Sequence, residues 1–247
     1  MEDIVDGHYR RLAQSYNDFL YYSPEFIRCL TSKMVEKLRL SEDDVLVDLG
    51  CGTAMYSLDM LQLVPLRSPV IGVDPFREML DQIPQQAPVT RVCEDALAFS
   101  ARPGTYNKVL MKEAIHHVGE KEQLFSNLHQ QLPDGGLLLL VHVPPRLQYP
   151  LFSEALQRCL SWHADPEELV VLLGGVGFDV ARDAMDYRHS IPKEDYFRMV
   201  EGRYMSVLSS FSDEEIRQGL AEMADTYADR SVLNFLDHFD YITARKS

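Results

Sequence analysis

Two glycines and a carboxylate surround the end of an apolar run near residue 45. The run Val45–Leu49 contains Asp48 and leads directly into Gly50, Cys51 and Gly52. Glycine lets a backbone bend sharply and approach a ligand, because it carries no Cβ. When such a turn joins a strand to a helix, the free N–H groups of the helix start face the ligand. The pattern therefore predicts a nucleotide-type cofactor site at the first turn of an open α/β sheet.

The residues around this turn exclude two common phosphate sites. A dinucleotide fingerprint would place a third glycine at position 55, where this chain has Met55, and no Lys-Ser or Lys-Thr pair follows as in a P-loop. Asp48 would repel a pyrophosphate, but it suits a ligand that carries an amine or another cation. We therefore expect a cofactor with a positive charge.

Further carboxylates follow the next two apolar runs. Val70–Val73 is followed by Asp74, 24 residues beyond Gly50, and Val89–Val92 is followed closely by Asp95. An acid after the second strand can accept hydrogen bonds from both hydroxyls of a ribose. An acid after the third strand can accept a bond from an exocyclic amine such as adenine N6.

A fourth apolar run leads to two adjacent histidines. Lys108–Met111 is followed by Glu113, His116 and His117, at the sheet edge where substrate meets cofactor in open α/β folds. Neighbouring side chains point to opposite sides of an extended chain, so we expect only one histidine to face the site. We select His117 as the candidate catalytic base. A neutral imidazole can take a proton from an amine or hydroxyl. Its alternative role is structural.

These motifs lie on an alternation of short apolar runs and helical patterns, which is typical of βαβ units and a parallel sheet. Two later strands, Phe178–Tyr187 and Phe235–Ala244, are expected to pair antiparallel at one sheet edge. The apolar runs are Val45–Leu49, Val70–Val73, Val89–Val92, Lys108–Met111 and Leu137–Val143, and the expected helices cover 54–63, 76–82, 119–131 and 165–173, the last closed by Gly174 and Gly175.

Helical segments are expected outside this core. Tyr9, Leu12, Tyr16 and Phe19 recur at three- and four-residue steps, which predicts one face of a helix. A second helix is expected to begin with Ser23 as its N-cap. The expected organisation is an N-terminal helical cap over 1–40, a cofactor-binding core over 41–190, a helical cap insertion over 191–233 and a final core strand over 234–247.

The composition of the chain disfavours several classes of binding partner. Lys+Arg 24 against Asp+Glu 38 gives a net charge of −14, which repels phosphate backbones and anionic lipids. No apolar run reaches the ~18 residues of a membrane span. The four cysteines form no C-x-x-C pair, so neither a zinc site nor a disulfide framework is expected. We expect a cytoplasmic protein without nucleic-acid or membrane partners.

The chain resembles the class I S-adenosylmethionine-dependent methyltransferases of the small-molecule type over about residues 40–180. The resemblance implies an α/β fold: a Rossmann-like, seven-stranded, mostly parallel sheet with its last strand antiparallel, helices on both faces and a helical cap. It also implies S-adenosylmethionine as the cofactor. The segments that carry it are V-D-L-G-C-G-T (47–53), G-V-D (72–74), C-E-D-A (93–96), K-E-A-I-H-H-V (112–118) and L-P-D-G-G-L-L-L-L (132–140).

The resemblance implies a role for each strand end. The methionine moiety would lie near Asp48–Gly52, the ribose at Asp74 and the adenine at Asp95 with Ala96. A tyrosine of the N-terminal helix would touch the methionine moiety or the substrate. Small-molecule members of the family, including phosphobase methyltransferases, have a basic histidine at the position that matches His117. The implied cofactor-binding residues are Tyr16, Asp48, Gly50, Cys51, Gly52, Asp74, Pro75, Asp95, Ala96 and Glu113.

Substrate contacts are expected from the caps. Tyr9 and Tyr22 are candidates, because aromatic faces can hold a cation. Arg203 could clamp a carboxylate or phosphate, or it could pair with a neighbouring glutamate. Arg146 and Tyr149, after the fifth strand, are further candidates. No metal is expected, since the clustered carboxylates of a metal-dependent catechol-type site are missing from the motifs.

The leading hypothesis is a methyltransferase that acts on a nitrogen or oxygen nucleophile of a small molecule. One alternative is a non-catalytic cofactor-binding regulator or partner subunit. Another is a protein methyltransferase, against which a deep enclosed pocket would count. The motifs do not select the substrate, the methylated atom or the oligomeric state.

Overall fold

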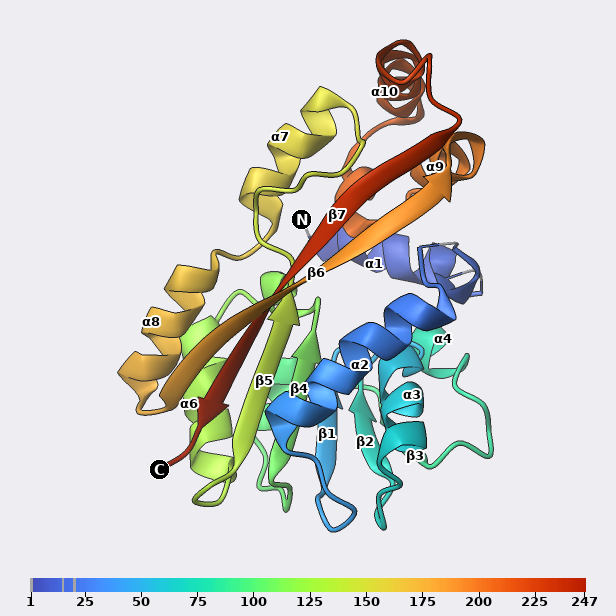
Figure 1. Ribbon diagram of the computed structural model, residues 1–247. Helices are drawn as coiled ribbons and strands as arrows, with labels where there is room; N and C mark the ends of the chain where they lie inside the picture. Colours follow the sequence, from blue (N-terminus) through green and yellow to red (C-terminus); the bar gives the residue numbers. More distant parts are fainter. Residues whose placement is uncertain (1, 15, 20) are drawn as a thin grey trace.

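The computed structural model describes residues 2–14, 16–19 and 21–247, with side chains for 7–14, 17–19 and 21–247. Seven strands form one sheet in the order β3-β2-β1-β4-β5-β7-β6, and helices cover both of its faces (Figure 1). The strands are β1 (Leu46–Leu49), β2 (Val70–Val73), β3 (Val89–Val92), β4 (Lys108–Lys112), β5 (Leu137–His142), β6 (Asp179–Pro192) and β7 (Val232–Arg245).

Strand direction confirms the expected Rossmann-like sheet. The first five strands pair in parallel, whereas β7 runs antiparallel to both β5 and β6. The last two strands are longer than predicted. They pair from Asp179 with Arg245 to Pro192 with Val232, and their far half continues past the tip of β5 as a two-stranded ribbon (Figure 1).

The helical elements follow the strands in the expected alternation, with helices α5 and α7 in addition to those predicted. They are α1 (Glu2–Leu12), η1 (Tyr16–Asp18), α2 (Pro24–Leu38), α3 (Met55–Leu63), α4 (Arg77–Leu80), α5 (Ala96–Ser100), η2 (Ile115–His117), α6 (Lys121–Gln131), α7 (Ser153–Trp162), α8 (Pro166–Val176), α9 (Lys193–Glu201), η3 (Ser206–Ser210) and α10 (Asp213–Thr226). The predicted N-cap of α2 is confirmed, because the Ser23 side chain accepts a bond from the Phe26 N–H at 3.2 Å.

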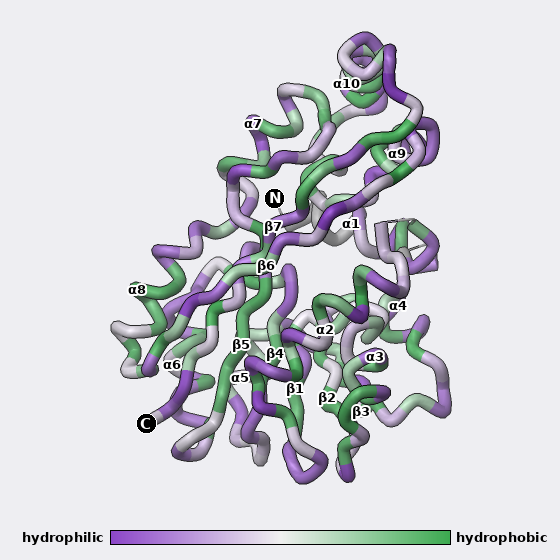
Figure 2. Tube along the Cα trace, in the orientation of Figure 1, coloured by the Kyte–Doolittle hydropathy of each residue, from purple (hydrophilic) through white to green (hydrophobic). Residues whose placement is uncertain are grey.

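Two hydrophobic cores hold the layers together. Leu46 of β1 packs in the core that contains the α2 side chains, whereas Val47 and Leu49 pack with α6 on the opposite face. Strands that are buried on both faces need apolar side chains at nearly every position, and the central strands are accordingly hydrophobic in Figure 2. The sheet is therefore a rigid platform whose carboxyl edge carries the motifs.

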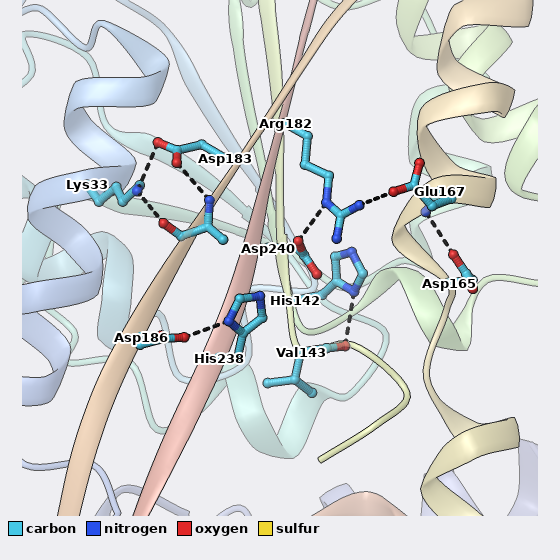
Figure 3. A network of polar contacts seen from close by, with 11 residues as sticks. Lys33, His142, Val143, Asp165, Glu167, Arg182, Asp183, Asp186, His238 and Asp240 are labelled. Atoms are coloured by element: carbon cyan, nitrogen blue, oxygen red, sulfur yellow. Dashed lines mark hydrogen bonds and ion pairs between the residues drawn. The ribbon is translucent and has the colours of Figure 1, made fainter. Parts of the chain in front are cut away.

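Polar contacts fix β6 to the helices beside it (Figure 3). Lys33 of α2 lies 2.9 Å from the Asp183 carboxylate of β6. On the other side, Arg182 donates to the buried Asp240 at 2.7 Å and also pairs with Glu167 of α8. The position of β6 is thus held from both faces of the sheet.

The N-terminal periodicity predicted one helix from Tyr9 to Phe19, and this was wrong. The helix α1 ends before Tyr16, which begins the separate η1 turn. The side chain of Asn17 accepts a bond from the Thr53 hydroxyl at 2.8 Å. Short polar side chains that bond outside their own helix favour a break, and this contact ties the segment to the first turn of the sheet instead.

The predicted end of α8 was also wrong. The helix continues through Gly174 and Gly175 and ends at Gly177. Gly177 has φ 110°, and its N–H bonds back to the carbonyls of the last turn. This left-handed position ends a helix most easily at glycine, so the third glycine of the run carries the stop.

The cap insertion lies at the far end of the ribbon, between β6 and β7 (Figure 1). The N-terminal helix packs against it, because His8 Nδ1 lies 2.7 Å from the Ser209 hydroxyl and Arg11 donates to the same oxygen at 3.0 Å. The two capping segments therefore meet each other over the sheet edge. Within the described residues, no helix is both long and apolar enough to cross a bilayer.

Candidate active site

A cavity of about 960 Å³ lies at the carboxyl edge of the sheet. Ligand pockets usually span roughly 300–1,000 Å³, so it can hold a cofactor together with a small second molecule. Its walls come from the strand ends, the N-terminal segment and the cap. The candidates that line it are Tyr9, Tyr22, Asp48, Gly50, Cys51, Gly52, Asp74, Pro75, Asp95, Ala96, Glu113 and His117.

One candidate with a described side chain, Arg203, is not part of this wall. Arg203 donates to the Asp213 carboxylate at 2.7 Å and to the Phe211 carbonyl at 3.2 Å, so its guanidinium forms an ion pair within the cap and the expected clamp is not supported. The side chain of Tyr16 lies outside the described residues. Of the two residues named after β5, Tyr149 lines the cavity and Arg146 does not.

The first turn requires glycine for two reasons. Gly50 has φ 77°, in the left-handed region, and its N–H donates to the Val73 carbonyl at 2.8 Å. A Cβ on Gly50 would lie 2.5 Å from the Cβ of Ala114, well inside contact distance. The turn therefore packs directly against the end of β4, and it holds open the space above it.

Asp74 links this turn to the next strand. Its Oδ2 accepts a bond from the Gly52 N–H at 2.8 Å, and its Oδ1 accepts one from the Phe76 N–H at 2.9 Å. Burial raises the pKa of Asp74 to about 6, against the lowering effect of these two bonds. Each carboxylate oxygen accepts more than one hydrogen bond, so both can still receive a ribose hydroxyl.

Two further carboxyl groups lie in the buried part of the cavity. Burial raises the pKa of Asp48 to about 6 and that of Glu113 to about 7. The Ser57 hydroxyl donates to Asp48 at 2.6 Å, and the Val143 N–H donates to Glu113 at 2.7 Å. A bound cation would favour the ionised form of both groups. This wall fits a cofactor that carries a sulfonium and an amine.

Glu113 and Asp95 also have unusual local roles. Glu113 has φ 53°, and a non-glycine residue in this region stores strain that is common at functional sites. Asp95 is exposed at the cavity mouth and caps α5, because its Oδ1 accepts from the Ala98 N–H at 2.8 Å. The capping bond leaves Oδ2 for an amine such as adenine N6.

Tyr9 and His117 meet in the cavity. The Tyr9 hydroxyl lies 3.2 Å from Nε2 of His117, and the Tyr9 ring stacks on Phe76 with centroids 5.2 Å apart. Burial lowers the pKa of His117 to about 4, and the nearby Lys121 ammonium adds to this effect. The imidazole is therefore neutral near pH 7 and can accept a proton.

The expectation that only one of the adjacent histidines faces the site was wrong. His116 and His117 both line the cavity, and their ring centroids are 4.0 Å apart. The segment Ile115–His117 is a turn of 3₁₀ helix and not extended chain. Successive side chains in such a turn are about 120° apart, which lets both rings reach the same space.

Sequence reasoning missed a tyrosine-lined part of the cavity. Tyr21 and Tyr149 both donate to the carboxylate of Asp237, which is fully buried in β7. The ammonium of Lys112 lies 4.5 Å from the ring centroid of Tyr56. The local signal for this network was an acid between Phe235 and Phe239 at alternate positions of one strand, since a buried carboxylate needs hydrogen-bond donors around it.

Comparison with known proteins places these features in a family. Residues 46–136 match the family model of a methyltransferase domain. No curated protein matches the sequence. A putative methyltransferase from an antibiotic biosynthesis pathway of Anabaena variabilis superposes with a TM-score of 0.64 at 18% identity, over 86% of this chain and 95% of that one.

Two further solved structures show the range of chemistry in this fold. Phosphoethanolamine N-methyltransferase 2 of Haemonchus contortus, with phosphomonomethylethanolamine and S-adenosylhomocysteine, has a TM-score of 0.58 at 18% identity, over 95% of this chain and 60% of that one. The [4+2]-cyclase SpnF has a TM-score of 0.60 at 17% identity, over 89% of this chain and 80% of that one. At such identities the likeness shows the fold alone.

The family model and the cavity agree on the same residues. The matched range contains the Gly50 turn, the Asp74 carboxylate and the buried acids that suit a sulfonium nucleoside. Residues 46–136 therefore match a methyltransferase domain, and the residues that line the cavity fit S-adenosylmethionine as the cofactor of such a domain.

Proposed function

We propose that this protein transfers the methyl group of S-adenosylmethionine to a nitrogen or oxygen atom of a small molecule. The observation that carries the proposal is the Tyr9–His117 pair, which lies in the same cavity as the cofactor-side acids. A proton acceptor beside the cofactor is what a nucleophilic nitrogen or oxygen needs, because it must lose a proton when it gains a methyl group.

The walls of the cavity support a small substrate. Met205, Ser206 and Val207 of the cap line it from one side, and Tyr9 of α1 lines it from another. A site enclosed by two capping segments suits a compact molecule better than a protein chain. The net charge of −14 likewise gives no support to a nucleic-acid partner.

In this proposal, some residues would bind the cofactor and others would transfer the proton. S-adenosylmethionine, when bound, supplies a methyl group that is activated by its sulfonium. Asp74 would hold the ribose, and the carboxylates of Asp48 and Glu113 would balance positive charge. The Tyr9 hydroxyl would receive the proton of the nucleophile and donate its own to Nε2 of His117. The caps exclude water and fix the approach of the nucleophile, which is a large part of such catalysis.

A cytoplasmic setting is part of the proposal. The four cysteines, Cys29, Cys51, Cys93 and Cys159, are all free thiols. Unpaired thiols persist most readily in a reducing compartment.

The test combines binding with turnover. Calorimetry should show that S-adenosylhomocysteine binds to the wild-type protein. A panel of small amines and hydroxyl compounds, assayed for release of S-adenosylhomocysteine, should contain at least one substrate whose turnover His117→Gln abolishes. Binding without turnover of any compound would favour a non-catalytic subunit, and a lack of binding would refute the use of this cofactor.

A further inference from the structure

A row of histidine rings continues from the Tyr9–His117 pair along the cavity wall. The ring of His116 lies 4.0 Å from that of His117, and the ring of His163 lies 5.1 Å from that of His116, measured between centroids. All three residues line the cavity. His163 comes from the connection between α7 and α8, so the row joins the end of β4 to a distant part of the chain.

Several nitrogens of this row have no hydrogen-bond partner within the described protein. They are Nδ1 of His116 and both Nδ1 and Nε2 of His163, all of them buried. His163 as a whole is 9% exposed. Buried polar atoms are nearly always hydrogen-bonded, and leaving them unpaired is costly. These nitrogens therefore indicate a polar group of a ligand at this position.

The chemistry of the rings selects the kind of group. Burial lowers the pKa of His163 to about 3 and that of His116 well below its usual value, so both rings are neutral. A neutral imidazole has one N–H donor and one bare nitrogen acceptor. A hydroxyl between the two rings can accept a hydrogen bond from the N–H of one ring and donate one to the bare nitrogen of the other. A carboxylate only accepts and an ammonium only donates, so each would pair with nitrogens of one kind and leave the facing nitrogen of the other kind unpaired.

The residues around His116 and His163 do not favour a charged group on the ligand. The ammonium of Lys121 lines the cavity near His116, which disfavours a second cation, and it already donates to the Val118 carbonyl at 2.7 Å. Within the described residues, no group of three or more His, Cys, Asp or Glu side chains is placed to hold a metal ion. The row is thus suited to an organic ligand.

We propose that His116 and His163 form a substrate subsite for a neutral hydroxyl group, next to the Tyr9–His117 pair. The inference rests on the proposed function and narrows its substrate class to hydroxylated small molecules. One polar group of the substrate faces Tyr9 as the nucleophile, and a hydroxyl bonds to the two neutral histidines.

Four compounds that share a benzene ring and differ in their polar group test this directly. Benzyl alcohol, benzoate, benzylamine and phenyl phosphate are titrated into the complex with S-adenosylhomocysteine at pH 7.5, and their dissociation constants are measured by calorimetry or ligand-observed NMR. We expect benzyl alcohol to bind about tenfold more tightly than each of the other three, since it alone satisfies donor and acceptor.

Matched variants assign the effect to the ring nitrogens. His163→Phe should weaken the binding of benzyl alcohol about tenfold, whereas His163→Gln keeps one donor and one acceptor and should restore most of it. His129→Phe makes the same change on α6, outside the cavity lining, and should have no effect. The affinity for S-adenosylhomocysteine should stay the same in all variants.

Each outcome has a separate meaning. Equal binding of the four compounds, or tighter binding of benzoate, phenyl phosphate or benzylamine, would overturn the hydroxyl subsite even if a variant failed to fold. The same holds if His163→Phe binds benzyl alcohol as well as the wild type does. A wild-type protein that does not bind S-adenosylhomocysteine would instead count against the proposed function itself.

Discussion

The Tyr9 hydroxyl lies 3.2 Å from Nε2 of His117, although the two residues are 108 positions apart. One side chain comes from the N-terminal helix and the other from the turn after β4. The pair exists only when that helix lies over the sheet edge, where it also contacts the cap through His8 and Ser209. In the proposed mechanism, the position of the N-terminal helix therefore both covers the site and completes the proton acceptor.

Removing this acceptor should affect turnover far more than binding. We expect His117→Gln to lower kcat by roughly 10²–10⁴-fold and Tyr9→Phe to lower it by about tenfold. Calorimetry with S-adenosylhomocysteine should give nearly wild-type affinity for both variants. Tyr187→Phe, on the remote ribbon, is the matched control. An equal loss of turnover and affinity would show that His117 has a structural role.

Asp74 should contribute to cofactor affinity through the ribose. Asp74→Ala should weaken S-adenosylhomocysteine binding by roughly 1–3 kcal/mol, because two acceptors are lost. Asp74→Asn keeps one oxygen and should lose less. Asp134→Ala changes an exposed acid at a distant turn and should have no effect. An unchanged dissociation constant for Asp74→Ala would contradict the assignment.

The affinity for the cofactor should decrease as the pH falls. The pKa values of Asp48 and Asp74 are raised to about 6 and that of Glu113 to about 7 by burial, so these groups take up protons as the pH falls through this range. Binding of a cation favours the ionised forms and releases protons. The affinity for S-adenosylmethionine should therefore fall from pH 7.5 to pH 5, and S-adenosylhomocysteine, which lacks the sulfonium, should show a weaker trend.

Calorimetry in buffers with different ionisation enthalpies measures the released protons at pH 6. Because the pKa of His117 is about 4, kcat at saturating cofactor should remain nearly constant down to about pH 5. Tighter binding of S-adenosylmethionine at acidic pH would be inconsistent with the role of the three acids.

Substitution of Gly50 should damage the first turn. Gly50→Ala combines a positive φ with a Cβ that lies only 2.5 Å from the Cβ of Ala114, so we expect a loss of roughly 1–3 kcal/mol in the free energy of unfolding and loss of S-adenosylhomocysteine binding. Adding Ala114→Gly should recover only part of the lost free energy of unfolding, because the backbone strain persists.

The control for this substitution is Gly174→Ala, inside α8. A Cβ there meets no atom within 4 Å, so we expect it to raise the free energy of unfolding by roughly 0.5–1 kcal/mol. Thermal and urea unfolding measure both effects. A Gly50→Ala variant as stable as the wild type would show that the turn tolerates a side chain.

The central strands could be predicted from sequence because they are buried on both faces. Val70–Val73 lies inside the sheet and has the predicted bounds, since a continuous apolar run between turns has few alternatives. The half-exposed edge strand Val89–Val92 also has the predicted bounds. The ribbon half of β6 and β7 was underestimated. In β6 the exposed Arg188 and Ser190 alternate with buried residues, so there is no continuous apolar run to mark the strand, although its buried face packs in the core through Ile191.

The residues of the site likewise fall into those that could be predicted from the sequence and those that could not. The Gly50 turn and the acids after each strand could be found because their roles follow from their place along one strand–turn unit. His163 could not, because only the packing of the α7–α8 connection brings it to His116. Arg203 was misjudged because its partner, Asp213, lies ten residues later in the cap and satisfies its charge.

The long β6–β7 ribbon has a consequence for how this enzyme could diversify. Its two strands pair through fourteen residues each and carry α9, η3 and α10 on their outer end. Insertions, deletions or replacements within 193–231 would leave every ladder bond of the sheet intact. The segment 193–231 could thus change during evolution, and the substrate preference with it. The strand ends that would bind the methyl donor would stay the same.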